Sequence, residues 1–446
     1  MKTEFILKIR SFSATNVYGY LDFETEFNRD INFLVGGNGS GKTTELKLIN
    51  ALAAPNLKDL LTIPFETADL IVEDRYNHIR LSARTHNNAK FLSCSAYSDE
   101  LELPNFGMDE FALQKSEKLE EEIDLILRRH AEHPVVKFIT NLPKPIFLGL
   151  DRRRDGDDSK GEDYYRHREM IYFSHSKKSY PSSRRSFKGS LGVSLMETEL
   201  LVQNTYRRLR ELEEKHSSNL RDSILLSSFQ YSEVGNESLI PDINKWKLLE
   251  RQREIRQALY KVVARDSKVS SEVDNFFSRL TTLAEQLQGN DDKFSIEWLL
   301  NKAQIDRMAK IVDIIDDHKS KVDQLFNPIK SFLKVVNEFY KDSHKRLEID
   351  AVGQLAVIRP GGTECTIEGL SSGERQILVI LAQVFFSGRK SSAIFLIDEP
   401  ELSLHLRWQE KISEVLFTIN PSVQFILATH SPEIVGNNKN KSVRCR

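Results

Sequence analysis

A glycine-rich segment near the start of the chain has the residue types that bind phosphate groups. Residues 36–44 read Gly-Gly-Asn-Gly-Ser-Gly-Lys-Thr-Thr and fit the spacing G-x-x-x-x-G-K-[S/T] between a predicted strand and a predicted helix. Glycines let backbone N–H groups wrap a phosphate chain, Lys42 can reach the terminal phosphates, and the Thr43 hydroxyl can bind Mg²⁺. The predicted phosphate-binding residues are Gly36, Asn38, Gly39, Ser40, Gly41, Lys42, Thr43 and Thr44.

Two adjacent carboxylates end an apolar segment much later in the sequence. Residues 393–397 read Ala-Ile-Phe-Leu-Ile and are followed by Asp398 and Glu399. Buried strands seldom end in paired carboxylates without a cation or a reaction to serve. We expect Asp398 to hold Mg²⁺ through water, and Glu399 to orient or deprotonate an attacking water. An acidic helix cap alone would also explain the pair, but less well beside a phosphate loop.

A serine-rich helix start provides a second predicted anion site. Its hydroxyl and N–H groups can bind an anion at the beginning of an apolar helix, although an ordinary serine N-cap would explain it in isolation. One nucleotide does not need two such sites from one chain, whereas two chains arranged head to tail would use both. The predicted residues are Ser371, Ser372, Gly373 and Glu374.

A histidine follows a predicted strand near the end of the chain. The strand Phe425–Thr429 leads directly to His430. An imidazole at this position could sense a terminal phosphate and help to position water. A structural histidine would explain the residue on its own, but its order after the other motifs favours a functional role.

Hydrophobic patterns predict the elements that position these residues. Strands are expected at 31–35, over 67–100, at 145–150, at 393–397 and at 424–428, and helices at 372–387 and 404–418. Most of 195–345 has a helical pattern without sustained heptads, which favours a packed helical insertion over a long coiled-coil arm. We expect this helical segment to be interrupted at Pro241 and Pro328. The predicted fold is α/β, with a mixed β-sheet, flanking helices and a large helical insertion. The predicted divisions are an N-terminal lobe at 1–150, a charged surface loop at 151–194, the helical insertion at 195–345 and a C-terminal lobe at 346–446.

Composition excludes several other classes of protein. The 446 residues include 63 Lys and Arg against 65 Asp and Glu, so a polycation that coats nucleic acid is not expected. The sequence has no apolar run long enough for a membrane span and no signal peptide, and its three cysteines fit neither a disulfide framework nor a zinc site. We expect a cytoplasmic protein with no membrane partner.

In this order, the four motifs resemble the ATP-binding-cassette (ABC) ATPase superfamily. Its Walker A motif matches 36–44, its signature motif matches 370–374, its Walker B strand and catalytic acid match 394–399, and its switch histidine matches His430. The resemblance implies ATP and Mg²⁺ as cofactors, ATP hydrolysis, a two-lobed ATPase head, and a homodimer or higher homo-oligomer in which the signature acts on the nucleotide of the other chain. It also implies a D-loop that contacts the other subunit, made of Ser403, Leu404 and His405.

Departures from the transporter pattern narrow the resemblance. The signature reads Ser-Ser-Gly-Glu, and a far longer stretch separates it from Walker A than in a transporter cassette. The runs 398–405 and 428–434, and the strand at 147–150 followed by Asp-Arg-Arg, are similar to the ATPase subunits of Septu-type, retron-associated and PARIS-type anti-phage systems. Such subunits usually act with a separate effector, often an HNH nuclease or a toxin. Few residues follow His430, so any nuclease is expected on another chain.

Some assignments stay open at this level. A DNA-repair or recombination ATPase that binds nucleic acid directly is the alternative, because residues 151–190 carry eleven Lys or Arg against seven Asp or Glu. The interleaved acids favour a solvated loop over a DNA-binding surface. The resemblance matches no Q-loop glutamine, and it leaves open whether Tyr18 or Tyr20 stacks on adenine.

Overall fold

The computed structural model describes residues 7–54, 56–74, 77–106, 122–123, 125–126, 128–149, 189–229, 274–279, 281–282, 296–387 and 394–445. Residues 151–188 of the predicted charged loop lie outside the described residues, as does Pro241. The chain divides into two compact units. The first comprises Met1–Asn204 and Phe332–Arg446, and the second comprises Thr205–Ser331.

A five-stranded parallel sheet lies at the centre of the first unit, with strand order β14-β3-β13-β12-β8. Within it, Asp398 pairs with Ala428 and with Gly149, and Thr429 pairs with Val35. The carboxyl ends of four neighbouring strands therefore meet at one edge, where ligands bind in open α/β sheets. The strands are β3 (Ile31–Val35), β8 (Ile146–Gly149), β12 (Ile394–Asp398), β13 (Gln424–Thr429) and β14 (Ser442–Arg444).

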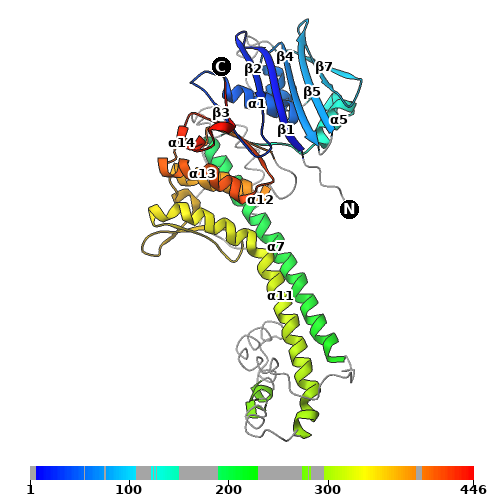
Figure 1. Cartoon of the computed structure of the whole chain (residues 1–446), viewed down its shortest axis with the longest axis vertical. Helices are drawn as coiled ribbons and strands as arrows, with labels where there is room; N and C mark the ends of the chain where they lie inside the picture. Colours follow the sequence, from blue (N-terminus) through cyan, green and yellow to red (C-terminus); the bar gives the residue numbers. More distant parts are fainter. Residues whose placement is uncertain are drawn as a thin grey trace. The chain divides into compact units, whose positions relative to one another are not determined.

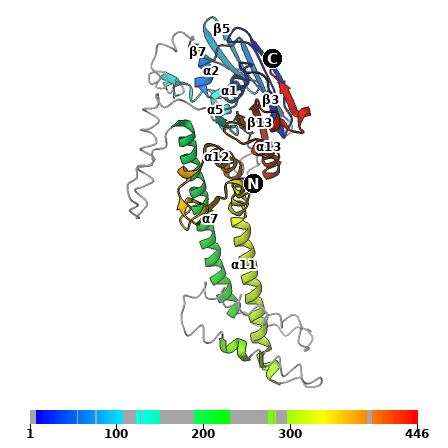
Figure 2. The same ribbon diagram turned by 90° about the vertical axis from the view of Figure 1, so that its left-hand side faces the viewer.

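A six-stranded antiparallel sheet forms the second layer, with strand order β2-β1-β4-β5-β6-β7. In β2 every second residue is buried, as expected for a sheet with one face against a core. The helix that follows the glycine loop, α1 (Lys42–Ala53), contacts β12 and β13 of the parallel sheet and β4 and β5 of the antiparallel sheet. Figures 1 and 2 show α1 against the antiparallel sheet. The strands are β1 (Leu7–Val17), β2 (Leu21–Glu26), β4 (Thr67–Asp74), β5 (Asn77–His86), β6 (Ala89–Cys94) and β7 (Glu100–Pro104).

The remaining elements of the first unit are short, apart from one buried helix. That helix, α12 (Ser372–Ser387), has few exposed residues and follows a three-stranded sheet of order β11-β10-β9. The other helices are α2 (Leu57–Thr62), α5 (Pro134–Asn141), α13 (Leu406–Ile419) and α14 (Pro432–Val435). The sheet strands are β9 (Arg346–Ile349), β10 (Leu355–Ile358) and β11 (Glu364–Cys365), and the 3₁₀ turns are η2 (Lys341–Ser343), η3 (Ile367–Gly369) and η4 (Lys439–Lys441).

The second unit is built on parts of two long helices, α7 (Gly189–Phe229) and α11 (Ile296–Tyr340). The two helices run antiparallel (Figures 1 and 2), and the ring of Tyr206 in α7 lies 6.1 Å from that of Phe326 in α11. The two helices have 41 and 45 residues. They are far longer than the helices that we expected from a sequence without sustained heptads. The prediction that Pro328 interrupts the helical segment is wrong, because it lies inside α11. A proline removes one of many hydrogen bonds in such a helix, and tertiary contacts can sustain the flanking turns.

The α/β fold with a large helical segment, predicted from the sequence, is confirmed. Strands predicted from hydrophobic pattern at 31–35, 145–150, 393–397 and 424–428 match β3, β8, β12 and β13 to within a residue or so. Within the described residues, no helix combines the length and the apolar character needed to cross a bilayer.

Candidate nucleotide-binding site

The glycine loop joins β3 to α1 and depends on glycine at two positions. Gly39 has φ of 78° and Gly41 has φ of 87°, values that other L-residues rarely adopt. A side-chain carbon at Gly41 would also lie 2.6 Å from Cζ of Phe23 in β2. The tip of the loop is exposed, and the first turn of α1 packs beneath it. The loop thus has left-handed glycines and an exposed tip, two features that a phosphate-binding loop would need.

The Lys42 ammonium folds back over the loop. Its Nζ donates hydrogen bonds to the backbone oxygens of Gly36 and Gly37, both at 3.0 Å, and lies 3.4 Å from Oγ of Ser40. Only 5% of the residue is exposed, and burial lowers the pKa of Lys42, although nearby acidic groups oppose the shift. A partly dehydrated ammonium gains more from an incoming phosphate than a fully hydrated one would.

The two predicted Mg²⁺ ligands lie in contact. The Thr43 hydroxyl donates to Oδ1 of Asp398 at 3.2 Å, although 355 positions separate the residues. Asp398 is the last residue of β12 and is only 9% exposed. Among the described residues, no group of three or more His, Cys, Asp or Glu could hold a metal ion. The donor set of one hydroxyl and one carboxylate therefore fits an ion whose other ligands are water and nucleotide oxygens.

Glu399 has a left-handed backbone, with φ of 49°. This conformation is uncommon for residues other than glycine and is often found at functional sites. The Glu399 N–H donates to the backbone oxygen of Ala428 at 2.9 Å, which fixes the turn after β12. The carboxylate is thus carried on a constrained turn next to Asp398.

Glu401 was not predicted as a site residue, yet it fixes the segment around His430. Its Oε1 accepts from the His430 backbone N–H at 2.6 Å, and its Oε2 accepts from the Thr429 hydroxyl at 2.8 Å. The His430 side chain is exposed. The last acid of the Asp-Glu-Pro-Glu run was the signal in the sequence that could have indicated this contact.

The serine-rich helix start forms a capping box at the beginning of α12. The Glu374 N–H donates to Oγ of Ser371 at 3.3 Å, and the Ser371 N–H donates to Oε2 of Glu374 at 2.7 Å. Ser371 and Ser372 are exposed, whereas Gly373 and Glu374 are buried. The two serines are therefore accessible at the surface, and the buried Glu374 holds Ser371 through the two hydrogen bonds of the capping box.

The helix start and the predicted D-loop pack against each other within one chain. A side-chain carbon at Gly373 would lie 2.5 Å from the backbone oxygen of Ser403, which has φ of 62°. Gln376 Nε2 donates to the Pro400 backbone oxygen at 2.8 Å. Leu404 is buried in this contact region, while Ser403 and His405 are exposed. The exposed residues of both motifs therefore belong to one surface.

A second support for the glycine loop comes from the far end of the sequence. Strand β14 pairs with β3, and the Cys445 N–H donates to the Val35 backbone oxygen at 2.9 Å, just before the loop. The Cys445 Sγ lies 3.2 Å from a carboxylate oxygen of Glu45 in α1, and the Thr25 hydroxyl donates to the other at 2.7 Å. Burial raises the pKa of Glu45. None of these supports was predicted, because no local pattern marks a three-residue edge strand.

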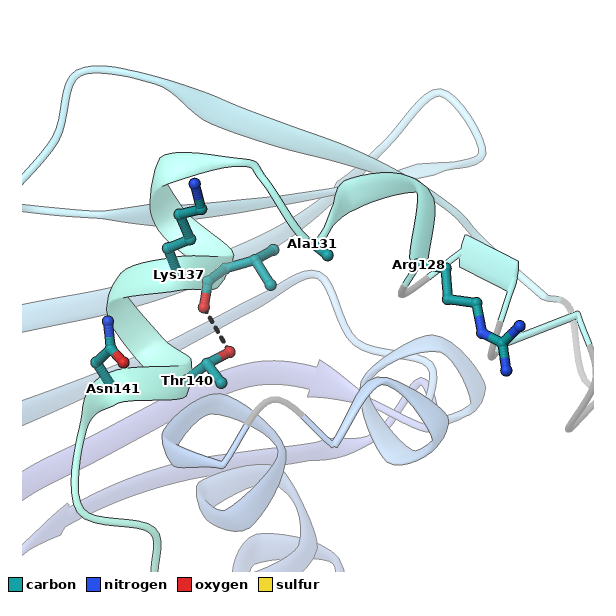
Figure 3. A pocket seen from close by; sticks show the side chains of 6 residues that line it. Arg128, Ala131, Lys137, Thr140 and Asn141 are labelled. Atoms are coloured by element: carbon teal, nitrogen blue, oxygen red, sulfur yellow. Dashed lines mark hydrogen bonds between the residues drawn. The ribbon is translucent and has the colours of Figure 1, made fainter.

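A hollow of about 370 Å³ lies elsewhere, on α5 (Figure 3). The Thr140 hydroxyl on its wall donates to the Val136 backbone oxygen at 2.6 Å. None of the predicted site residues lines it, and we assign it no role. Its lining residues are Arg128, Ala131, Val136, Lys137, Thr140 and Asn141.

Together, the fold and the site have the features expected of a P-loop nucleotide-binding domain. A parallel sheet carries the glycine loop and the Asp-Glu pair at one edge, with Thr43 and Asp398 in contact. The chain belongs to the family described as "AAA domain, putative AbiEii toxin, Type IV TA system", which matches residues 31–436. The resemblance inferred from the motifs is thereby confirmed at the level of the family.

Two curated relatives are named as retron ATPases. The "Retron Vc95 probable ATPase" of Vibrio cholerae serotype O1 biovar El Tor is 30% identical over 191 residues, which cover 37% of this chain and 37% of the relative. The "Retron Ec83 probable ATPase" of Escherichia coli is 23% identical over 141 residues, which cover 27% of this chain and 26% of the relative. The chain thus spans only about a quarter to a third of the length of the curated relatives it matches.

Solved structures with similarity to the chain include two Smc head domains. That of Pyrococcus furiosus, with an extended coiled coil and bound to the C-terminal domain of ScpA, gives a TM-score of 0.41 at 13% identity and covers 97% of this chain and 92% of that chain. The Smc head domain of Pyrococcus yayanosii, with a coiled coil and joint, gives a TM-score of 0.35 at 13% identity. The match covers 97% of this chain and 93% of that chain.

Proposed function

We propose that this chain binds and hydrolyses ATP with Mg²⁺, as the ATPase subunit of an anti-phage defence complex. The main support for the proposed ATPase activity is the 3.2 Å contact between the Thr43 hydroxyl and the Asp398 carboxylate. Glu399 follows Asp398 directly in the chain. Nucleoside triphosphatases of this class hold Mg²⁺ with such a pair. The family and the two retron relatives support the role in defence.

Each residue of the site has a proposed task. Lys42 binds the terminal phosphates, and Thr43 and Asp398 hold Mg²⁺, which neutralises charge on the phosphates. Glu399 orients the attacking water and accepts its proton. His430 lies at the end of the neighbouring strand, where its imidazole would contact the terminal phosphate.

We further propose that the site is completed by a second copy of the chain. Ser371 and Ser372 are exposed at the start of a helix, where the free N–H groups and the helix field favour an anion. In a head-to-tail dimer these serines would close over the phosphates bound by Lys42 of the partner. ATP would then hold a paired state that hydrolysis releases, and this switch would control a separate effector, for which an HNH nuclease is one candidate.

The test measures ATP turnover and mass by light scattering, for the wild-type chain and for Lys42→Ala, with and without Mg²⁺ and ATP. We expect the wild type to hydrolyse ATP and to pair when ATP is present, because the loop and the serines then act on one nucleotide. Lys42→Ala should do neither. Equal turnover in both proteins would contradict the ATPase assignment, and turnover by a chain that never pairs would contradict the dimer.

A further inference from the structure

A buried carboxylate occupies the first turn of the helix that would meet the partner's phosphate. Glu374 is 2% exposed and is the third helical residue after the cap Ser371. A phosphate and a carboxylate repel each other, and a negative charge in the first turn offsets the favourable helix field felt by a second anion. If this helix start is to bind a phosphate, the charge of Glu374 needs a counter-charge.

Lys345 supplies that counter-charge. Its Nζ donates to Oε2 of Glu374 at 2.8 Å, and the two side chains are 20% and 2% exposed. Burial raises the carboxyl's pKa, but hydrogen bonds from Lys345, Ser343 and Ser371 outweigh it and hold the pKa of Glu374 below its ordinary value. The group is therefore an ionised carboxylate in a nearly buried ion pair, and removal of one partner would leave an uncompensated charge.

The same carboxylate oxygen fixes the serine. Oε2 of Glu374 accepts from both Lys345 and the Ser371 backbone N–H, the latter at 2.7 Å. Oγ of Ser371 accepts from the Glu374 N–H, so the hydroxyl proton of the exposed serine stays available to a phosphate oxygen. A second tether comes from Tyr340, whose hydroxyl donates to the Glu374 backbone oxygen at 2.8 Å.

We propose that Lys345 is a positioning residue for the phosphate contact made in trans. It neutralises Glu374 and, through that carboxylate, holds Ser371 in place for the terminal phosphate bound by a second copy of the chain. The inference rests on the proposed function, because it presumes pairing around ATP. It also accounts for the acid at the end of the signature, because a glutamine there would need no lysine.

The experiment compares five full-length proteins: the wild type, Lys345→Met, Glu374→Gln, the double variant, and Lys341→Met. The last is a matched control, because it removes a nearby lysine whose partner, Glu338, is exposed. For each protein, a fluorescent ATP analogue reports nucleotide affinity at a concentration where the chain is monomeric. Light scattering then gives the dimer affinity with ATP, and steady-state kinetics give kcat and KM.

We expect Lys345→Met to weaken ATP-dependent pairing by at least about tenfold and to lower kcat similarly, because a buried charge loses its partner next to the phosphate. Affinity of the monomer for the nucleotide should stay within about twofold, since Lys42 is untouched. The double variant should return to the level of Glu374→Gln, because glutamine keeps the capping bond without the charge. Lys341→Met should match the wild type.

Three results would overturn the inference. In the first, Lys345→Met pairs as well as the wild type. In the second, the double variant stays as impaired as Lys345→Met, so that the charge of Glu374 is not the cause. In the third, nucleotide affinity of the monomer falls together with pairing, which would indicate a general loss of structure. A wild-type chain that stays monomeric with ATP would instead overturn the proposed function, and this inference with it.

Discussion

The charged residues of the candidate site differ in how far they are buried and in the contacts that hold them. Lys42 is almost fully buried and makes its hydrogen bonds to the backbone of its own loop. Such bonds can be exchanged for phosphate oxygens at little cost, because both are acceptors and the ammonium is already partly dehydrated. Glu399, by contrast, is only half-buried, and it has an uncommon backbone conformation that the hydrogen bond of its N–H to Ala428 helps to fix.

Glu399→Gln should separate nucleotide binding from hydrolysis. The amide has the size of the carboxylate but cannot accept the proton of water, so we expect turnover to fall by a factor of about 10² to 10⁴. ATP affinity should be unchanged, because Lys42, Thr43 and Asp398 remain. Phosphate release and equilibrium binding of a labelled nucleotide check this, with Glu410→Gln on the exposed side of α13 as control. A variant that hydrolyses ATP at the wild-type rate would contradict the assignment.

The sequence was most informative for residues that belong to spaced motifs. Thr43 and Asp398 could be paired before their contact was known, because each follows a strand and each suits Mg²⁺. Glu401 and Lys345 were not predicted as site residues, because their partners lie 29 positions away in the sequence. Long-range side-chain contacts of this kind depend on which elements pack together, and hydrophobic periodicity does not determine that.

At the level of elements, helix α12 is held at its first turn by contacts with two other segments. Its glycine lies against the backbone of the loop before α13, and its capping glutamate is tied to Lys345. The helix was predicted to within a residue, from an apolar run with serines before it. The neighbours of the parallel strands were not predictable locally, since β8 and β14 are edge strands of four and three residues.

Gly373→Ala should loosen the contact between α12 and the D-loop even without nucleotide. The added carbon would lie 2.5 Å from the Ser403 backbone oxygen, and backbone cannot rotate away as a side chain can. We expect a loss of about 1–3 kcal/mol in the free energy of unfolding. Chemical denaturation of the nucleotide-free chain measures it, with the exposed Ser372→Ala as control. Equal midpoints for wild type and Gly373→Ala would show that the loop moves aside freely.

A buried lysine in the antiparallel sheet should make stability depend on pH. Lys90 is 1% exposed, and its Nζ donates to the backbone oxygens of Leu60 and Ile63, both at 2.6 Å. Burial lowers the pKa of Lys90 from 10.5 to about 7. Between these values the unfolded chain binds more protons than the folded one, so the contribution of Lys90 to stability rises as pH rises.

Lys90→Met should abolish this contribution. Between pH 7 and 10, the free energy of unfolding of the wild type should rise relative to the variant by up to about 1.4 kcal/mol per pH unit. Denaturation at several pH values measures the difference, and Lys137→Met, which removes an exposed lysine, should follow the wild type. Parallel pH profiles for the wild type and Lys90→Met would show that Lys90 titrates normally in the folded chain.

On the scale of the whole chain, the first unit joins the two ends of the sequence into one sheet. Strand β3 lies between β13 and β14, and α1 contacts strands from both the early and the late parts of the chain. The site therefore forms only when both parts fold together. The phosphate loop and the exposed serines belong to different motifs, so each can be altered separately. Separate variants can test whether the two motifs of one site come from the same chain or from two chains.

Two inactive variants should restore pairing when they are mixed. Lys42→Ala lacks the phosphate loop's cation, and Ser371→Arg places a bulky side chain at the helix start, so neither should pair with itself in ATP. A mixed dimer has one intact composite site, built from Lys42 of one variant and Ser371 of the other. Because neither variant pairs with itself, every dimer is mixed and keeps one of two sites, so up to about half of wild-type turnover should return. Differently tagged variants should co-purify only with ATP present. If both motifs instead acted on a nucleotide within one chain, the mixture would capture no more than either variant alone.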